Sequence, residues 1–299
     1  MNNSVIETKG LTVYYGKHRG VVDLNLTVRQ GEVFGFLGPN GAGKTTTQRV
    51  LLDIIRPSQG TAHIFGQDCQ RDGVAIRKRV GYIPGELALP FMKASAYLDM
   101  LVAVRGNHTD PAYRRMLCER LNLDTSRKMR EYSRGNKQKV GVVAAFMSKP
   151  DLLILDEPTS GLDPLMQQTV LELVREAQAD GRTVFFSSHI LSEVQAVCDR
   201  VGIIRNGQLV AVEKVQDLLA RRLHRLRLQF RALIAPELLH VPGITVIEHN
   251  ADQVMVEVQE NLDEFMAQVA PYGIIDIETV ELSLEEVFLA YYGGGNGHV

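Results

Sequence analysis

The stretch Asp151-Leu-Leu-Ile-Leu-Asp-Glu-Pro-Thr-Ser-Gly-Leu-Asp163 contains the pattern that decides the fold. Its apolar run, residues 152–155, is typical of a strand buried on both faces of a parallel sheet. Asp156 and Glu157 follow directly. Ligands of open α/β sheets bind beyond the carboxyl ends of strands, so these carboxylates lie where a metal–nucleotide complex would bind. Taken alone, the stretch fits equally well a buried strand that ends in solvated acids.

Composition sets the class of protein. The 299 residues are 45% hydrophobic and 23% charged, which predicts a soluble globular protein with one large and one smaller domain. The net charge of −2 gives no general attraction to nucleic acid, which we therefore do not expect as a partner. No signal-peptide core opens the chain, and its apolar runs fall short of the ~20 residues that span a bilayer. Cys69, Cys118 and Cys198 lack metal-ligand spacing and indicate reduced thiols in a cytoplasmic protein.

A phosphate-binding motif follows a second predicted buried strand, residues 33–37. It matches G-x-x-x-x-G-K-[ST] and reads Gly38-Pro39-Asn40-Gly41-Ala42-Gly43-Lys44-Thr45-Thr46. The glycines permit unusual backbone conformations, and the N–H groups at the start of the next helix, about residues 44–54, favour anions. Lys44 is placed to reach the β- and γ-phosphates of a nucleotide, and the Thr45 hydroxyl is placed to ligate Mg²⁺.

Two other polar positions have both a functional and a purely structural interpretation. The loop Tyr132-Ser-Arg-Gly-Asn136 opens a predicted helix over residues 137–147. Ser133 suits the N-cap of this helix, whose start favours an anion, and an ordinary capped helix is the alternative. Tyr15 directly follows a predicted strand over residues 6–14, where simple strand packing would also explain it.

His189 lies just past a further predicted buried strand, residues 183–187. A single histidine is most often structural. Because His189 shares a predicted sheet edge with Lys44 and Glu157, the pattern favours a place in the site.

The composition changes near residues 221–225, which predicts a domain of residues 1–220 and another of residues 221–299. In the second domain, predicted strands alternate with predicted helices: strands over residues 226–230, 244–248, 254–258 and 274–280, and helices over residues 235–239, 262–269 and 283–291. This alternation predicts a small α+β sandwich of the ferredoxin-like kind.

Together these motifs resemble, in the same order, those of the ATP-binding subunit of an ABC transporter. Residues 38–45 match the phosphate loop, and residues 152–157 match the second nucleotide motif. Residues 132–136, followed by Gln138, resemble the LSGGQ signature, and residues 160–163 resemble the loop that pairs two subunits. His189 matches the switch histidine, and Tyr15 matches the aromatic residue that stacks on adenine. The resemblance covers about residues 4–220. Residues 284–292 are similar to the extension of many drug and antibiotic exporter ATPases.

The resemblance implies an α/β fold: a P-loop NTPase core of the RecA-like kind, an N-terminal antiparallel β subdomain, and a helical subdomain at about residues 87–149. It implies ATP and Mg²⁺ as cofactors, with Thr45 and Asp156 on the metal. Lys44 would neutralise the γ-phosphate, Glu157 would orient or deprotonate the attacking water, and His189 would bind the γ-phosphate.

The resemblance also implies partners. In the family, the signature residues, here Ser133 and Gly135, close on the ATP of a second subunit, and the loop that ends at Asp163 pairs the two subunits. We therefore expect a homodimer that drives a separate integral membrane permease, docked near residues 87–91, at the cytoplasmic face of the membrane. Export of a drug, antibiotic or lipid-like molecule is favoured over import, and the transported molecule is not identified.

One position departs from the family pattern. After the strand over residues 80–83 the family usually has a glutamine that touches Mg²⁺ and the attacking water, whereas this chain has Gly85 followed by Glu86. Either water replaces the glutamine or Glu86 becomes a ligand, since Mg²⁺ accepts both. We favour water, with Glu86 directed toward the permease surface.

Other nucleotide-binding classes fit less well. A GTPase would need Asn-Lys-x-Asp, and residues 136–139 lack the final acid. A kinase would not explain residues 132–136 or 160–163. ABC proteins of DNA repair or the ribosome carry long coiled coils or tandem nucleotide domains, which this chain lacks. Glu157 and His189 argue against a purely regulatory nucleotide sensor, because a sensor would need neither residue.

Overall fold

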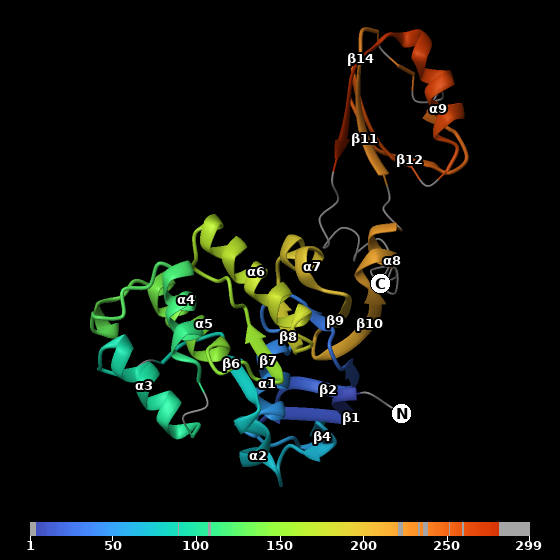
Figure 1. Cartoon of the computed structure of the whole chain (residues 1–299). Helices are drawn as coiled ribbons and strands as arrows, with labels where there is room; N and C mark the ends of the chain where they lie inside the picture. Colours follow the sequence, from blue (N-terminus) through green and yellow to red (C-terminus); the bar gives the residue numbers. More distant parts are fainter. Residues whose placement is uncertain are drawn as a thin grey trace. The chain divides into compact units, whose positions relative to one another are not determined.

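The computed structural model describes residues 4–88, 90–106, 109–220, 224–232, 234–235, 239–250, 252–258 and 260–280 (Figure 1). The chain divides into two compact units, Met1–Gln216 and Asp217–Val299. The helix predicted over residues 283–291 and the exporter-like segment 284–292 lie outside the described residues, as does most of the helix predicted over residues 235–239.

A six-stranded sheet forms the centre of the first unit, as far as the chain is described, with strand order β10-β9-β3-β8-β7-β6. The strands are β3 (Val33–Leu37), β6 (Val80–Ile83), β7 (Leu152–Asp156), β8 (Thr183–Ser188), β9 (Arg200–Arg205) and β10 (Gln208–Lys214). All neighbours are parallel except β10, which is antiparallel to β9. Every residue of β3, β7 and β8 is buried, as the apolar runs predict for strands covered on both faces.

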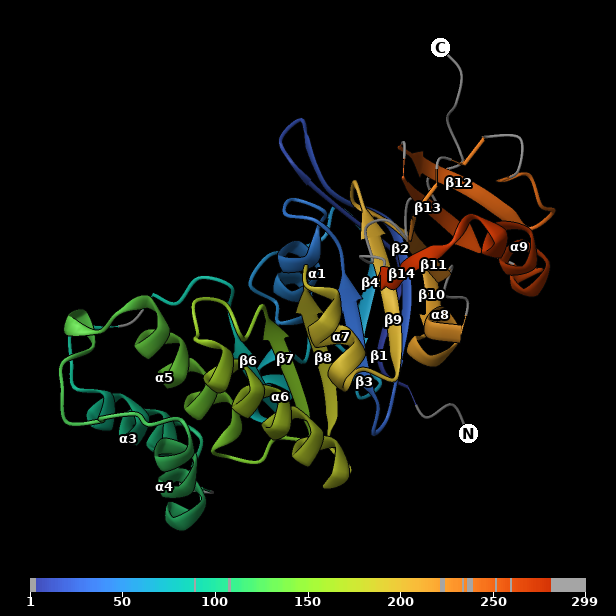
Figure 2. The ribbon, with the colours of Figure 1, turned by 90° about the horizontal axis from the view of Figure 1, so that it is seen from above.

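The register of the parallel strands brings their carboxyl ends level. Leu37 of β3 lies opposite Ser188 of β8, and Asp156 of β7 lies opposite Ser187. Figure 2 shows β3, β8 and β7 side by side. The segments that follow these strands therefore leave the sheet at one edge, where the sequence predicts the site.

Strands β9 and β10 form a hairpin whose turn lies beside the loop after β3, where the Gly207 N–H donates a hydrogen bond to the Ala42 carbonyl at 2.9 Å. Asn206 and Gly207 join β9 to β10 with φ of 51° and 76°. Positive φ at both central residues is the mark of a type I′ turn, which Asn-Gly favours.

A four-stranded antiparallel sheet, order β2-β1-β4-β5, covers one face of the central sheet (Figure 1). Its strands are β1 (Ser4–Tyr15), β2 (His18–Arg29), β4 (Gln59–Ile64) and β5 (Gln67–Asp68). It shares a hydrophobic core with the central sheet and helix α1, in which the fully buried members include Ile6, Leu11, Leu24, Phe34, Phe36, Leu51 and Phe185. Helices α6 and α7 lie on the opposite face of the central sheet.

The helices of the first unit are α1 (Lys44–Leu51), α2 (Gly73–Lys78), α3 (Ala94–Val104), α4 (Pro111–Arg120), the 3-10 turn η1 (Met129–Glu131), α5 (Arg134–Phe146), α6 (Pro164–Ala179) and α7 (Leu191–Val197); α8 (Val215–Ala220) spans the division between the units. Helices α3, α4 and α5 group beside β6 (Figure 1). The Arg105 side chain, just after α3, donates a hydrogen bond to the Val80 carbonyl of β6 at 2.9 Å. This bond links the end of α3 to β6.

Two predicted helix boundaries are wrong, each for a local reason. Helix α5 begins at Arg134 rather than at residue 137, because Ser133 is its N-cap and accepts a hydrogen bond from the Asn136 N–H. Helix α1 ends at Leu51 rather than at residue 54, since Asp53 adopts a left-handed conformation, a common helix stop.

The second unit holds its own sheet, order β12-β13-β11-β14, with all neighbours antiparallel in the residues described. Its elements are β11 (His224–Phe230), β12 (Ile244–His249), β13 (Gln253–Val258), α9 (Leu262–Val269), η3 (Ala270–Tyr272) and β14 (Ile274–Val280). The strand order is that of the ferredoxin-like fold predicted from the sequence. Phe230, Val256 and Phe265 belong to a hydrophobic core within this unit.

Within the described residues, no helix is both long and apolar enough to cross a membrane.

Candidate nucleotide-binding site

The loop between β3 and α1 has the backbone of an anion site. Gly41 and Gly43 have positive φ, 79° and 113°, and a Cβ at Gly43 would lie 2.8 Å from the Gly20 carbonyl oxygen. Glycine is therefore required at position 43 for both conformation and space. Helix α1 begins at the next residue, so its free N–H groups face the concave side of the loop.

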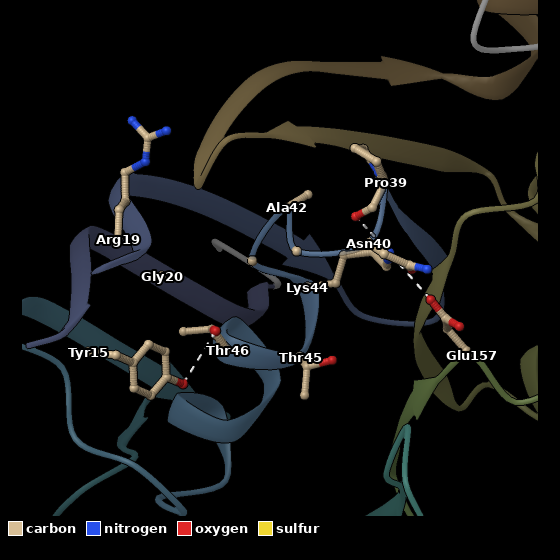
Figure 3. Close-up of a pocket in the computed structure, with 12 residues that line it drawn as sticks. Tyr15, Arg19, Gly20, Pro39, Asn40, Ala42, Lys44, Thr45, Thr46 and Glu157 are labelled. Atoms are coloured by element: carbon tan, nitrogen blue, oxygen red, sulfur yellow. Dashed lines mark hydrogen bonds and ion pairs between the residues drawn. The ribbon is translucent and has the colours of Figure 1, made fainter. Parts of the chain in front are cut away.

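A pocket opens over this loop (Figure 3). Its lining contains every residue of the predicted phosphate motif except Gly38, and consists of Tyr15, Arg19, Gly20, Pro39, Asn40, Gly41, Ala42, Gly43, Lys44, Thr45, Thr46 and Glu157. Tyr15 is 44% exposed, and its hydroxyl lies 3.4 Å from the Thr46 hydroxyl. Tyr15 is therefore placed beside the phosphate loop. The sequence did not single out Arg19, which lies near the start of β2 and pairs with Tyr14 of β1.

Lys44 is buried, with only 5% of its side chain exposed. Its Nζ donates hydrogen bonds to the carbonyls of Gly38 at 2.6 Å and Pro39 at 3.3 Å. It also lies 3.4 Å from Oε1 of Glu157. The ammonium group is thus held at the bottom of the phosphate loop, within reach of the carboxylate that follows β7.

Asp156, at the end of β7, connects three segments of the site. The Thr45 hydroxyl donates to Oδ2 at 2.7 Å, and the Ser187 hydroxyl of β8 donates to Oδ1 at 2.6 Å. The carboxyl is 1% exposed, and its position is therefore fixed. Burial, followed by the Asp156 charge, raises the pKa of nearby Tyr82 to about 12, so this phenol is neutral.

Glu157 occupies the mouth of the pocket in an unusual conformation. Its φ is 49°, in the left-handed region that a non-glycine residue rarely adopts without compensating contacts. Its N–H donates to the Ser187 carbonyl at 3.2 Å. Its Oε1 lies 3.1 Å from Nδ1 of His189 as well as 3.4 Å from Lys44 Nζ. The structure therefore brings Lys44, Glu157 and His189 together, as the sequence predicts for one sheet edge.

Ser133, Gly135 and Asp163 form a second cluster. Ser133 caps α5, and Asp163 caps α6 by accepting a hydrogen bond from the Met166 N–H at 3.0 Å. A Cβ at Gly135 would lie 2.7 Å from the Gly161 carbonyl oxygen, so the two helix starts touch through this glycine. These residues do not line the pocket described above.

Gly85, where the family has glutamine, approaches Asp156 closely. A Cβ built at Gly85 would lie 2.9 Å from Oδ2 of Asp156 and 3.3 Å from its Cγ. Because hydrogen bonds fix this carboxylate, any side chain at position 85 would displace it or the loop. Glu86 is exposed.

The fold and the site together define a P-loop nucleoside triphosphatase. The family model described as ABC transporter matches residues 21–160. The bacitracin transport ATP-binding protein BcrA of Bacillus licheniformis is 34% identical over 98% of this chain and 99% of its own length. The chain therefore belongs to the ABC transporter family, as an ATP-binding subunit and ABC ATPase.

Two further similarities agree with this membership. The linearmycin resistance ATP-binding protein LnrL of Bacillus subtilis (strain 168) is 30% identical over 98% of each chain. A solved structure of an ATP-binding subunit of an ABC transporter superposes with a TM-score of 0.66 at 30% identity, over 73% of this chain and 92% of that one.

Proposed function

We propose that this ATPase subunit drives export of a drug-like or antibiotic-like molecule through a separate integral membrane permease. The role of the subunit as the ATPase rests on one observation: the Glu157 carboxylate lies between Lys44 and His189 at the mouth of the phosphate-loop pocket. Export is supported by the relatives named for bacitracin transport and linearmycin resistance, which match this chain over 98% of its length.

The residues of the pocket fit a complex of ATP with Mg²⁺. The glycine cradle, the buried Lys44 and the paired Thr45 and Asp156 oxygens are the donors and acceptors that phosphate and a hard cation require. Thr45 and Asp156 would hold the ion directly or through water. When bound, Mg²⁺ supplies charge neutralisation for the phosphates.

The protein's own groups then have distinct tasks in hydrolysis. Lys44 would exchange its carbonyl partners for phosphate oxygens. Glu157 would accept a hydrogen bond from the attacking water and orient or deprotonate it, and His189, 3.1 Å away, would bind the γ-phosphate. Tyr15, half-exposed at the rim of the pocket, would stack on adenine.

A second copy of the chain would complete the site. Ser133, Gly135 and Asp163 lie in a cluster that does not line the pocket, yet helix starts of this kind favour anions. In a homodimer the Ser133–Gly135 loop of one chain would close on the ATP of the other. Binding of ATP would then close the dimer, and hydrolysis would open it.

The permease would dock at the segment after β6, on the cytoplasmic face of the membrane. Leu87 packs against α5 at Gly141, whereas Phe91 exposes 90% of its surface. Because Leu87 attaches this segment to α5, the exposed Phe91 ring is suited to burial against a partner.

Replacing Glu157 by glutamine tests the catalytic assignment. We expect Glu157→Gln to lower ATP turnover by about 10²–10⁴-fold, because the amide cannot act as a base, while ATP binding persists. Lys44→Ala should weaken ATP binding as well. Steady-state turnover and equilibrium ATP binding distinguish the two variants, and full activity in Glu157→Gln would overturn the assignment.

Adding a methyl group at Gly85 tests the metal assignment. Gly85→Ala would press on the Asp156 carboxylate, so we expect the Mg²⁺ concentration for half-maximal ATPase activity to rise about 10-fold or more. Glu86→Ala is the matched control on the same loop and should leave the Mg²⁺ requirement unchanged. An unchanged requirement in Gly85→Ala, or a large rise in Glu86→Ala, would contradict this arrangement.

We further propose that residues 221–299 form an accessory domain that regulates or stabilises the dimer. All pocket residues precede this segment, and Phe230, Val256 and Phe265 belong to a separate core. A chain ending at residue 220 should therefore fold and bind ATP with near full-length affinity, as measured by calorimetric titration. A truncated chain with a cooperative unfolding transition but no ATP binding would contradict this proposal.

A further inference from the structure

We propose that Glu193 is a positioning residue that holds His189 in register with Glu157. The inference rests on the proposed roles of Glu157 and His189 in ATP hydrolysis. Glu193 lies in the first turn of α7, and only 5% of its surface is exposed. It does not line the pocket, so any effect on hydrolysis must act through other residues.

The Glu193 carboxylate joins two segments that are distant in sequence. Its Oε1 accepts a hydrogen bond from the Thr159 hydroxyl at 2.5 Å, and its Oε2 accepts one from the Ser188 hydroxyl at 2.6 Å. An ionised carboxylate has no proton to donate and can satisfy both hydroxyls at once. Hydrogen bonds to a charged acceptor are also about twice as strong as neutral ones.

Each of these hydroxyls belongs to a residue that lies close in sequence to Glu157 or His189. Thr159 lies two residues after Glu157. Ser188 immediately precedes His189, and its hydroxyl oxygen also accepts a hydrogen bond from the Ile190 N–H at 2.9 Å. Ser188 therefore fixes the backbone on both sides of the histidine. Through these contacts the Glu193 carboxylate sets the relative positions of the two segments.

The Glu157 segment is held from its other side as well. The Gln138 amide of α5 donates hydrogen bonds to the carbonyls of Pro158 at 2.9 Å and Glu157 at 3.3 Å. With the turn restrained from α5, loss of Glu193 would free chiefly the Ser188–Ile190 loop. The 3.1 Å spacing between His189 Nδ1 and Glu157 Oε1 would then be lost, while the phosphate loop, which Glu193 does not touch, would stay intact.

The test compares Glu193→Ala and Glu193→Gln with Glu32→Ala in the full-length chain. Glu32 is the matched control: it is also buried, and it accepts hydrogen bonds from the Arg29 N–H at 2.6 Å and Arg200 Nη1 at 3.0 Å. It precedes β3 and so lies at the opposite end of the parallel strands from the pocket. Removing either carboxylate leaves buried polar groups unpaired, so both variants should be destabilised.

We expect Glu193→Ala to lower kcat for ATP about 10²-fold, the effect of misplacing a reactive group by about 1 Å. Its equilibrium dissociation constant for ADP, which lacks the γ-phosphate that His189 would bind, should stay at the wild-type value. Glu193→Gln keeps one acceptor oxygen, and Ser188 can redirect its proton to the Ile190 carbonyl at 3.3 Å, so its kcat should be intermediate. Glu32→Ala should lower the thermal unfolding midpoint but keep kcat.

The possible outcomes separate this inference from the proposed function. Loss of turnover in Glu157→Gln and His189→Ala, but wild-type kcat in a folded Glu193→Ala, would overturn the positioning role alone. Equal losses of kcat in Glu193→Ala and Glu32→Ala at equal unfolding midpoints would also overturn it, since stability would then explain both. Full turnover in Glu157→Gln would instead overturn the proposed function.

Discussion

The hydrogen-bonded Asp156 carboxylate is the interaction on which the site depends. Asp156 ends β7 and accepts hydrogen bonds from Thr45, which follows the phosphate loop, and from Ser187 of β8. One buried side chain therefore joins the ends of β7 and β8 to the start of α1. The hydrogen bond to Ser187 forms because the strand register places Asp156 opposite that residue. A one-residue shift of β7 would turn this carboxylate to the other face of the sheet.

The same carboxylate leads to the strained residue after it. Glu157 adopts its left-handed conformation between the fixed Asp156 and a turn that Gln138 and Glu193 restrain through their hydrogen bonds. Backbone strain of this kind costs about 1–3 kcal/mol and persists where surrounding contacts determine it. In this conformation Oε1 of Glu157 lies 3.4 Å from Lys44 Nζ and 3.1 Å from His189 Nδ1.

The sequence predicted the parts of the site that rest on local patterns. The strand before Asp156 and the strand–loop–helix unit around Lys44 each follow from neighbouring residues, and the structure confirms them. The partners of Asp156 and Glu193 could not be found in this way. Ser187 lies 31 residues from Asp156 and Thr159 lies 34 from Glu193, so these contacts exist only once the strand register is set. The only local sign of a role for Ser187 was that two serines end a strand whose middle is apolar. At Gly85 the sequence revealed the missing glutamine, but only the packing reveals the close approach to Asp156.

The central claim is that the pocket of one chain and the Ser133–Gly135 cluster of another together hydrolyse ATP. Mixing two inactive variants tests it most directly. Lys44→Ala impairs the pocket, and Gly135→Asp impairs the cluster, where even a Cβ would meet the Gly161 carbonyl at 2.7 Å. A mixed dimer would retain one undamaged pocket facing one undamaged cluster. The account predicts that each variant alone is inactive and that ATP turnover reappears on mixing. Turnover in the mixture no greater than the sum of the separate variants, with wild-type protein active under the same conditions, would contradict it.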